Sequence, residues 1–250
     1  MKAPIPPIRS FQNHIWQSLL DALFPPRCAA CLGWSRTVFC ESCAPKLRPI
    51  DAPQCQKCGV PFDPLAFAAA ECALCRKKAP HFEAARAAFH FDGPIRDAIH
   101  RLKYHEKSAL AGRLAPFLAQ LLGSDAMLRD FAPDFLVAVP LHPRRLRKRG
   151  FNQSQLLALE LSRQCKIPLA APLRRTRNTT PQVELKGDER AKNVRGAFEI
   201  DATIWAQIGG KNARFLLIDD VITTGSTLGE AALVLKKAGA DGVCALTLAR

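Results

Sequence analysis

The residues best suited to chemistry in this 250-residue chain lie in the stretch FLLIDDVITTGST, residues 215–227. An apolar segment of strand type runs into the adjacent carboxylates Asp219 and Asp220. A turn of small and hydroxyl residues follows, made of Thr223, Thr224, Gly225, Ser226 and Thr227. Glycine permits a tight backbone, and hydroxyls with free helix amides can hold a phosphate. A Ser or Thr N-cap is the structural alternative, but adjacent carboxylates repel phosphate and so favour a ligand with a cation or sugar hydroxyls between them.

Cysteines form the second group of residues with recognisable chemistry. Eight of the ten occur in four CxxC pairs, Cys28/Cys31, Cys40/Cys43, Cys55/Cys58 and Cys72/Cys75. Two such pairs complete a tetrahedral shell for zinc, with disulfides or an iron–sulfur cluster as alternatives. Sequential pairing of the motifs closes shorter loops than interleaved pairing and is therefore favoured. Closed four-cysteine shells have no open position, so the predicted zinc is structural.

The charge balance favours an anionic partner. Lys and Arg number 36 against 22 Asp and Glu, a formal charge of +14. A basic cluster, RRLRKR, occupies residues 144–149, and Arg174, Arg175 and Arg177 form another. Phosphate, pyrophosphate and nucleic acid all fit this charge, as does an ordinary soluble basic protein. The cysteine module is either a metal-dependent folding unit or a nucleic-acid contact.

Residues 1–25 predict a leading amphipathic helix. Their pattern lacks the continuous apolar core of a secretory signal, and Asp21 interrupts the most apolar part. The apolar runs of the chain are too short or too charged for a membrane span. Reduced cysteines and a cytoplasmic location are therefore expected.

Alternating strands and helices must position these groups. Short apolar segments at 134–140, 167–173, 214–219 and 242–250 predict strands, as does 83–91. Segments 152–165 and 227–240 predict helices, and two further helices are expected between Gly93 and Leu122. The alternation is typical of an α/β fold with a mostly parallel sheet flanked by helices. Its ligand is expected beyond the strand carboxyl ends, where loops 140–151, 174–196 and 219–227 would gather.

FLLIDDVITTGST resembles the phosphoribosyl pyrophosphate motif of the type I phosphoribosyltransferases. The resemblance implies that Asp219 and Asp220, the catalytic pair, face the ribose hydroxyls directly or through Mg²⁺. It also implies that residues 223–227 hold the 5-phosphate.

A narrower resemblance covers nearly the whole chain. VPLHPRRLRKRGFNQSQLLA (139–158), RRTRNTTPQVELKGDERAKNVRGAF (174–198) and the cysteine module are similar to the ComF family. These competence-associated proteins join a zinc ribbon to a domain of phosphoribosyltransferase type. The implied organisation is a leading helix at 1–25, a double zinc ribbon at 26–80 and a phosphoribosyltransferase-type domain at 81–250.

The resemblance also assigns roles to two loops. Residues 140–150 correspond to the pyrophosphate loop, with Arg144, Arg145 and Arg149 as candidate ligands. Residues 176–195 correspond to a flexible loop, in which Gln182, Arg190 and Asn193 are the candidates. Lys103 and Tyr104, near a predicted helix end, are expected to face the site.

The expected function is binding of phosphoribosyl pyrophosphate with Mg²⁺ and transfer of the phosphoribosyl group to an acceptor that the sequence does not identify. One alternative is an accessory protein of DNA uptake that binds single-stranded DNA. Another is a ligand-sensing scaffold without catalysis. Structural Zn²⁺ is expected in each case, and DNA-uptake proteins are candidate partners.

Overall fold

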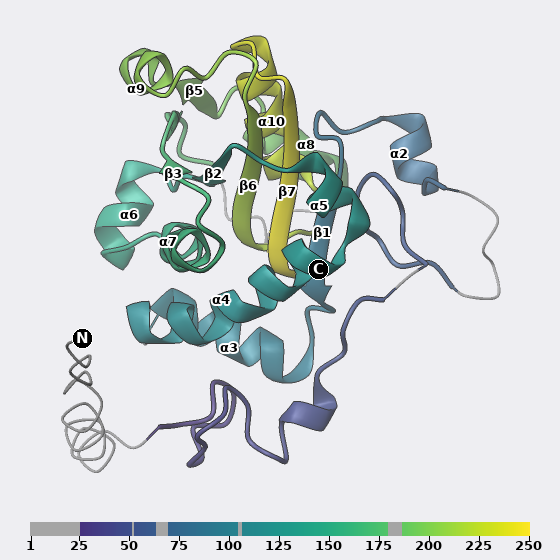
Figure 1. The fold of residues 1–250 in the computed structure, drawn as a ribbon, viewed down its shortest axis with the longest axis vertical. Coiled ribbons are helices and arrows are strands. Elements are labelled where there is room, and N and C mark those ends of the chain that lie inside the picture. Colours follow the sequence, from purple (N-terminus) through teal and green to yellow (C-terminus); the bar gives the residue numbers. More distant parts are fainter. Residues whose placement is uncertain (1–25, 52, 64–69, 105–106, 180–186) are drawn as a thin grey trace, which may run out of the picture.

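The computed structural model describes residues 26–51, 53–63, 70–104, 107–179 and 187–250. Its centre is a five-stranded parallel sheet in the order β1-β7-β6-β2-β3 (Figure 1). The strands are β1 (Ala85–Phe89), β2 (Phe135–Ala138), β3 (Leu169–Ala170), β6 (Arg214–Val221) and β7 (Gly242–Ala249). The predicted mostly parallel sheet is therefore confirmed.

The central strands are apolar because both of their faces are covered. In β6, Leu216 and Ile218 belong to one apolar core, whereas Phe215 and Leu217 belong to the other. Every residue of β7 is buried. Strands of a parallel sheet covered on both sides are expected to read as continuous hydrophobic runs, which is why these segments were recognisable in the sequence.

Helices cover the two faces of the sheet (Figure 1). Those whose side chains enter the first core are α3 (Gly93–Tyr104), α4 (Lys107–Ser124), α5 (Ala126–Phe131) and α7 (Gln153–Cys165). The second core is closed by α10 (Ser226–Lys237), through Leu228, Ala231 and Leu235. The shorter helices are α6 (Pro143–Arg149), α8 (Gly187–Val194) and α9 (Ala202–Gln207).

Two predicted segments fold differently from the expectation. The 167–173 stretch forms β3 and, separately, the start of β4 (Leu173–Arg175), which pairs antiparallel with β5 (Phe198–Ile200). Pro168 and Pro172 explain the division, because proline cannot donate to a strand ladder. The prediction of a continuous loop at 140–151 is also wrong, since α6 occupies most of it.

Local signals account for α6. Pro143 stands in its first turn, and the Nδ1 atom of His142 accepts a hydrogen bond from the amide of Arg144 at 3.2 Å. Gly150 ends the helix in the left-handed conformation, with φ 79°. Proline at a helix start and glycine just past its end are the usual terminal residues. The basic residues 144–149 are therefore displayed around a helix.

The order in which the chain adds strands to the sheet changes direction between the parallel neighbours β2 and β6. From β2 the chain continues to β3 at one edge of the sheet, whereas from β6 it continues to β7 on the other side. Such a switch point leaves a crevice at the carboxyl ends of the two neighbouring strands. The end of β6 carries Asp219 and Asp220, so this crevice is where the acidic pair lies.

The cysteine module packs against the sheet and its helices. It contains a short 3₁₀ helix, η1 (Ala44–Lys46), and α2 (Ala73–Lys77). Cys28 and Cys43 belong to the first core, and Cys55, Cys58 and Cys75 to the second. The predicted leading helix lies outside the described residues, and the domain boundaries stay predictions. Among the helices of the described ranges, none has the length and apolarity needed to cross a membrane.

Candidate functional site

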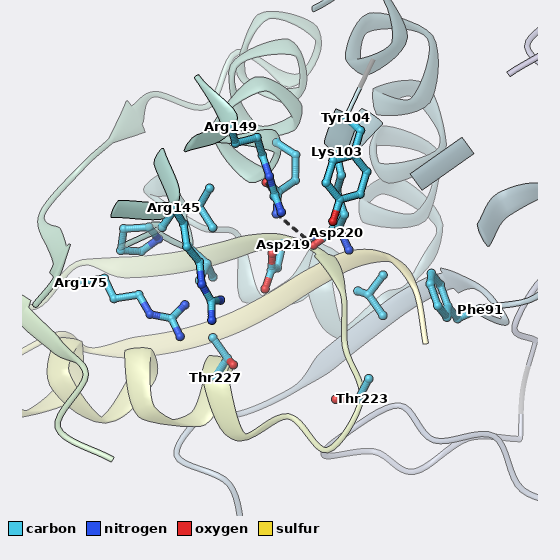
Figure 2. A pocket seen from close by; sticks show the side chains of 15 residues that line it. Phe91, Lys103, Tyr104, Arg145, Arg149, Arg175, Asp219, Asp220, Thr223 and Thr227 are labelled. Atoms are coloured by element: carbon cyan, nitrogen blue, oxygen red, sulfur yellow. Dashed lines mark hydrogen bonds and ion pairs between the residues drawn. The ribbon is translucent and has the colours of Figure 1, made fainter. Parts of the chain in front are cut away.

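A cavity of about 270 Å³ opens at the carboxyl ends of β2 and β6 (Figure 2). The acidic pair forms its floor, and arginines from α6 and β4 stand along one wall. The end of α3 and the segment after β1 contribute aromatic side chains to the opposite side, Tyr104 and Phe91. Residues from five separate parts of the chain therefore meet at the predicted edge of the sheet.

Asp219 and Asp220 are held by groups from two helices. Asp219 Oδ1 accepts hydrogen bonds from Ser154 Oγ at 2.7 Å and from the Asp220 amide at 2.9 Å. Asp220, which is only 5% exposed, forms an ion pair with Lys103 in which Nζ lies 2.6 Å from Oδ2. Gln153 Nε2 lies 3.4 Å from Asp220 Oδ1. The two carboxylates are thus fixed in orientation, and Lys103 neutralises one of them.

The electrostatics of the pair are asymmetric. Burial, with the charge of Asp220 as a second cause, raises the pKa of Asp219 to about 7. Burial also acts to raise the pKa of Asp220, but the ammonium of Lys103 outweighs it and holds that pKa below its ordinary value. Near neutral pH the floor of the cavity therefore gains from a nearby cation or from hydroxyl donors.

The wall of the cavity that carries the arginines includes a buried guanidinium, that of Arg175, with a hydrogen-bond donor that has no acceptor among the described residues. Arg175 is 8% exposed, donates from Nη2 to Thr179 Oγ1 at 2.6 Å, and packs over the ring of Phe198. Its Nε is buried without a hydrogen-bond acceptor among the described residues. Burial lowers the pKa of Arg175, and the charge of Arg145 lowers it further. Two guanidinium groups at one wall disfavour each other's charge, and an anion between them would relieve that repulsion.

The α6 arginines differ in their placement. Arg145 and Arg149 line the cavity, and Arg149 also donates to Gln153 Oε1 at 2.5 Å and lies over the Tyr104 ring (Figure 2). Arg145 donates to the carbonyl of Thr179. Arg144 is exposed and does not line this cavity within the described part of the chain. Helical spacing thus separates Arg144 from the other two candidates.

The hydroxyl turn divides between two cavities. Thr223 and Thr227 line the 270 Å³ cavity. Thr224, Gly225 and Ser226 line a neighbouring cavity of about 480 Å³ on the other side of the turn. The N-cap of α10 is Gly225, in the left-handed conformation with φ 76°, so a hydroxyl N-cap does not explain the turn. Its glycine is required by backbone geometry.

The flexible-loop candidates cannot all be placed. Gln182 lies outside the described residues, and so does the side chain of Arg190. The backbone at Arg190 belongs to α8, as does the half-buried Asn193. A helix here differs from the expectation of an aperiodic loop, and the roles of these residues stay predictions.

Several residues that line the cavity or hold its acidic pair had no role assigned from the sequence. Gln153 and Ser154 occupy the first turn of α7, which begins beside the ends of β2 and β6. Their position in the sequence could have identified them, because a helix that follows a loop at the carboxyl edge of the sheet starts at the ligand crevice. In the sequence Arg175 was recognisable only as part of a basic cluster, since its burial depends on the antiparallel pairing of β4 with β5.

The eight paired cysteines form two sites. Sulfur atoms of Cys28, Cys31, Cys40 and Cys43 lie within 4.8 Å of one another, as do those of Cys55, Cys58, Cys72 and Cys75. The Cys31–Cys40 and Cys58–Cys72 sulfur separations are 3.6 and 3.7 Å. A tetrahedron with Zn–S bonds of about 2.3 Å has edges of about 3.8 Å, so both sites fit zinc. The sequential pairing is confirmed.

These features define a class of protein in which a double zinc ribbon is joined to a parallel α/β domain. A family model described as a double zinc ribbon domain matches residues 19–77. DNA utilization protein YhgH of Escherichia coli K12 is 32% identical over 215 residues, covering 85% of this chain and 90% of that protein. Competence protein F of Haemophilus influenzae is 30% identical over 233 residues, which cover 90% of this chain and 96% of that protein. The chain belongs to the ComF family.

More distant similarities extend to other proteins. Competence protein ComFC of Bacillus subtilis is 25% identical over 217 residues, which cover 84% of this chain and 83% of that protein. A solved structure of glutamine phosphoribosylpyrophosphate amidotransferase from Bacillus subtilis is 17% identical, with a TM-score of 0.38. The match spans 58% of this chain and 29% of the amidotransferase. That similarity is too low to assign an activity.

Proposed function

We propose that this ComF-family protein binds phosphoribosyl pyrophosphate with Mg²⁺ and transfers the phosphoribosyl group to an acceptor. The observation that carries the proposal is that one cavity places an acidic pair, buried Asp220 and half-buried Asp219, opposite the buried guanidinium of Arg175. Asp219 and Asp220 are suited to hydroxyls or a cation, whereas Arg175 has a buried Nε available for an anion. A ligand with both kinds of group satisfies the two sides together.

Each part of the ligand has a complementary surface. The ribose hydroxyls would donate to Asp219 and Asp220, and the 5-phosphate would meet the hydroxyl turn beside Thr223 and Thr227. The diphosphate would lie along the wall formed by Arg145 and Arg175. Planar guanidinium groups pair with phosphate oxygens and stay charged, which suits them to a polyanion.

The carboxylates also suit a substrate-borne Mg²⁺. This ion is commonly held by one or two carboxylates together with substrate phosphates, rather than by a complete protein shell. Asp219 and Asp220 supply that number of carboxylates. A bound Mg²⁺ would neutralise charge on the diphosphate. Lys103 already neutralises Asp220, so Asp219 is the carboxylate with more to gain from the ion.

The main requirement of the proposed transfer is stabilisation of the leaving group. The bond between ribose C1 and the diphosphate oxygen breaks, and a lone pair of the acceptor forms the new bond to C1. Negative charge collects on the departing diphosphate, where Arg145 and Arg175 would stabilise it. The acidic pair would steady the sugar as positive charge develops at its ring.

Calorimetry of the full zinc-loaded chain tests the binding step. The wild type should release heat with phosphoribosyl pyrophosphate and Mg²⁺, and the double variant Asp219→Asn/Asp220→Asn should bind at least about 100-fold more weakly, since charged hydrogen bonds and ion contacts are lost. Asp130→Asn, an exposed carboxylate 76% accessible, is the matched control and should bind as the wild type does. Equal heats in all three proteins would refute the proposal.

The transfer step needs a separate assay. Release of diphosphate should rise when a competent acceptor is added from a panel of amines, bases and nucleotides, and the double variant should abolish the increase. Binding without release across the panel would favour a ligand-sensing scaffold without chemistry.

Contact with single-stranded DNA is a second candidate function, favoured by an exposed aromatic residue on the zinc ribbon. Trp34 is 65% exposed, and the guanidinium of Arg36 lies 5.6 Å from its ring centre. Aromatic rings stack on bases and nearby cations contact phosphates, so this pair suits an unpaired strand. The names of the Escherichia and Haemophilus relatives refer to DNA utilization and competence.

Fluorescence anisotropy with a labelled single strand tests this candidate. Affinity should fall steeply between about 50 and 200 mM salt. Trp34→Ala should weaken binding by about 5-fold or more, consistent with about 1–3 kcal/mol per stacked base. Leu74→Ala, another exposed apolar residue, should have no effect. Salt-independent binding, or equal effects of the two substitutions, would contradict the DNA contact.

A further inference from the structure

We propose that Arg250 couples the second zinc site to the ligand cavity, so that zinc at Cys55, Cys58, Cys72 and Cys75 and ligand in the cavity stabilise each other. The side chain of Arg250 contacts a zinc ligand, and its main chain holds a residue that lines the cavity. The zinc part of the inference is independent of the proposed function, and the ligand part rests on it.

The second cysteine knuckle is docked on the sheet through its main chain. Three successive carbonyls of this knuckle accept hydrogen bonds from the α/β part of the chain. The pairs are Arg86 Nη1 to Gln56 O at 3.0 Å, Ala85 N to Lys57 O at 2.7 Å, and Arg250 Nη1 to Cys58 O at 2.5 Å. The knuckle is therefore fixed to the edge strand β1 and to the residue after β7.

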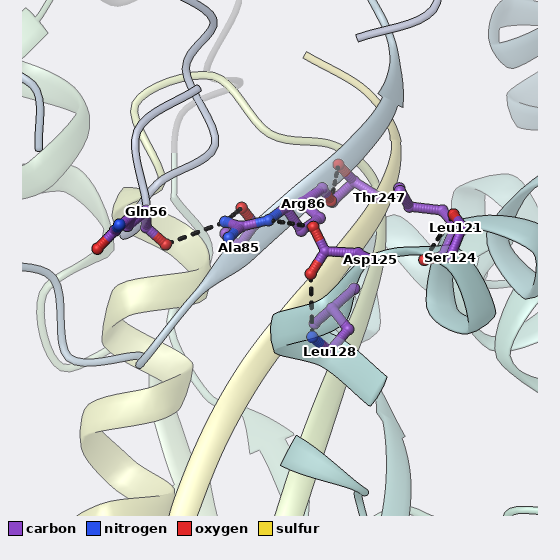
Figure 3. A network of polar contacts seen from close by, with 8 residues as sticks. All are labelled: Gln56, Ala85, Arg86, Leu121, Ser124, Asp125, Leu128 and Thr247. Atoms are coloured by element: carbon purple, nitrogen blue, oxygen red, sulfur yellow. Dashed lines mark hydrogen bonds and ion pairs between the residues drawn. The ribbon is translucent and has the colours of Figure 1, made fainter. Parts of the chain in front are cut away.

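Arg86 is itself firmly held. Its Nε lies 2.7 Å from Asp125 Oδ2, and the two side chains are 6% and 13% exposed (Figure 3). Asp125 also caps α5 by accepting the amide of Leu128 at 3.0 Å. A buried arginine paired on one side with a carboxylate and on the other with Gln56 O gives the knuckle a rigid support.

Close packing at Gly59 reinforces the docking. A Cβ atom at this position would lie 2.4 Å from the carbonyl oxygen of Ala85, and the glycine has φ +71°. Both observations require glycine, because L side chains rarely adopt this conformation and the approach leaves no space for one. The knuckle thus contacts β1 without intervening side-chain volume.

Arg250 adds charge where the metal site needs it. Four thiolates and one Zn²⁺ leave two net negative charges. Nη2 of Arg250 lies 3.6 Å from the sulfur of Cys58 and can donate to it. At the first site, Cys28 sulfur accepts from backbone amides of Ala30 and Cys40, each at 3.4 Å, and Cys31 is exposed. The second site is more buried and has a guanidinium contact to one of its sulfurs.

The main chain of Arg250 carries the connection to the cavity. Its amide donates to Phe89 O at 2.9 Å, and its main-chain oxygen accepts from the amide of Phe91 at 2.6 Å. The Phe91 ring lines the ligand cavity (Figure 2). Loss of zinc would leave neighbouring thiol groups to rearrange around Cys58 and release the guanidinium, which would loosen the residue that positions Phe91.

Coupling between two sites is reciprocal, which supplies a measurement that needs no activity. We would follow the alkylation of each cysteine by iodoacetamide with mass spectrometry, using the full zinc-loaded chain. Phosphoribosyl pyrophosphate with Mg²⁺ should slow alkylation of the second-site cysteines by at least about fivefold. The first-site cysteines should react faster than the second-site cysteines and be unchanged by the ligand.

Arg250→Ala tests the residue directly. Alkylation of Cys58 should become about 10-fold faster or more, with the first-site cysteines unchanged, as expected when a partner of a metal ligand is removed. Arg163→Ala removes an arginine side chain that is 64% exposed and should match the wild type. Arg250→Lys keeps the charge but not the two-pronged geometry and should give an intermediate rate. Circular dichroism confirms that each variant is folded, and an unfolded Arg250→Ala leaves Arg250→Lys to decide.

The outcomes separate the two proposals. Equal Cys58 rates in wild type, Arg250→Lys and Arg250→Ala would overturn the zinc part of the inference. A ligand that binds by calorimetry but leaves the second-site rates unchanged would overturn the coupling alone. Absence of ligand binding by calorimetry would overturn the proposed function and with it the ligand half, whereas the Arg250 comparison would still decide the zinc half.

Discussion

Lys103 compensates the buried member of the two adjacent carboxylates that line the cavity. Its ammonium lies 2.6 Å from Asp220 Oδ2 and holds the pKa of that group low against the opposing effect of burial. Asp219 depends instead on Ser154 and the Asp220 amide, and its pKa rises to about 7. One carboxylate is thus compensated by an ion pair within the protein, and the other is the one that we propose to be compensated by a ligand.

Replacing Lys103 should therefore destabilise the fold before any ligand is added. We expect Lys103→Met to lower the free energy of unfolding by about 1–3 kcal/mol, less than for a fully buried pair because the lysine side chain is 23% exposed. Urea unfolding would measure the change. In an Asp220→Asn background the same substitution should cost less than about 0.5 kcal/mol. An equal cost in both backgrounds would show that the ion pair is not the cause.

Replacing Arg175, in contrast to Lys103, should affect ligand binding more than the free energy of unfolding. Because burial and Arg145 disfavour its charge, Arg175→Met should change the free energy of unfolding by no more than about 1 kcal/mol. The affinity for phosphoribosyl pyrophosphate should fall by about 10-fold or more, since one charged hydrogen-bonding partner is lost. Calorimetry and urea unfolding measure the two effects. Arg174→Met is the control and should leave affinity unchanged, because the Arg174 side chain is 66% exposed. If Arg175→Met lowered the free energy of unfolding by more than it weakened the free energy of binding, the role of Arg175 would be structural.

Site residues could be predicted from the sequence where neighbouring residues alone bring them together. Asp219, Thr223 and Thr227 stand in one contiguous motif, so their meeting required only the end of a strand and the start of a helix. Arg175 reaches the cavity because β4 pairs antiparallel with β5, and α8 lies between these two strands in the sequence. No local pattern encodes such a pairing, which is why that arginine had no assigned role.

The turn between β6 and α10 shows how an element constrains the site. Gly225 has φ 76°, while a Cβ there would meet its nearest neighbour, Phe82 Cζ, at 3.5 Å, an ordinary contact. The requirement for glycine is therefore conformational. The same turn divides Thr223 and Thr227 from Thr224 and Ser226, which line different cavities.

Gly225→Ala should destabilise the fold, whereas Gly229→Ala should not. Alanine at 225 must adopt the left-handed conformation, so the free energy of unfolding should fall by about 1–2 kcal/mol, and ligand binding should weaken. Gly229 lies within α10 with open space around it, so alanine there should be neutral or stabilising by up to about 1 kcal/mol. Thermal unfolding of the two variants measures the difference. Equal stability of the two variants would contradict the conformational argument.

Element prediction succeeded where burial and periodicity agreed. The strands β6 and β7 are apolar on both faces, and α7 and α10 have apolar positions at helical spacing with clear ends. It failed for α6, whose sequence PRRLRKR has little apolar face and whose ends are determined by His142 and Gly150. The cap residues were the only local indication of this helix, and the strongly basic sequence was interpreted as a loop instead.

At the scale of the whole molecule, the zinc ribbon and the α/β domain share their cores. Cys55, Cys58 and Cys75 are buried in the same core as Phe215 and Val137. Arg113, in α4, donates to Arg27 O and Thr37 O, both at 2.5 Å. The ribbon is therefore expected to unfold together with the sheet rather than as an independent unit.

Removal of zinc should destabilise the entire chain. We expect a metal analysis to find two zinc ions per chain, and stripping them should lower the Tm of the sheet and helices by about 10 °C or more. Loss of 3–4 kcal/mol has roughly this effect for a chain of this size. Calorimetric scans of zinc-loaded and chelated protein, followed at constant reducing conditions, measure it. A chelated protein whose main transition is unshifted would show that the two parts are thermodynamically separate.

We propose, above all, that one cavity holds a ribose 5-phosphate diphosphate between an acidic floor and an arginine wall. A crystal structure with phosphoribosyl pyrophosphate and Mg²⁺ tests it most directly. We predict ribose hydroxyls on Asp219 and Asp220, the 5-phosphate beside Thr223 and Thr227, and the diphosphate against Arg145 and Arg175. Ligand bound only in the neighbouring 480 Å³ cavity, or no ligand in either cavity at saturating concentration, would contradict the account.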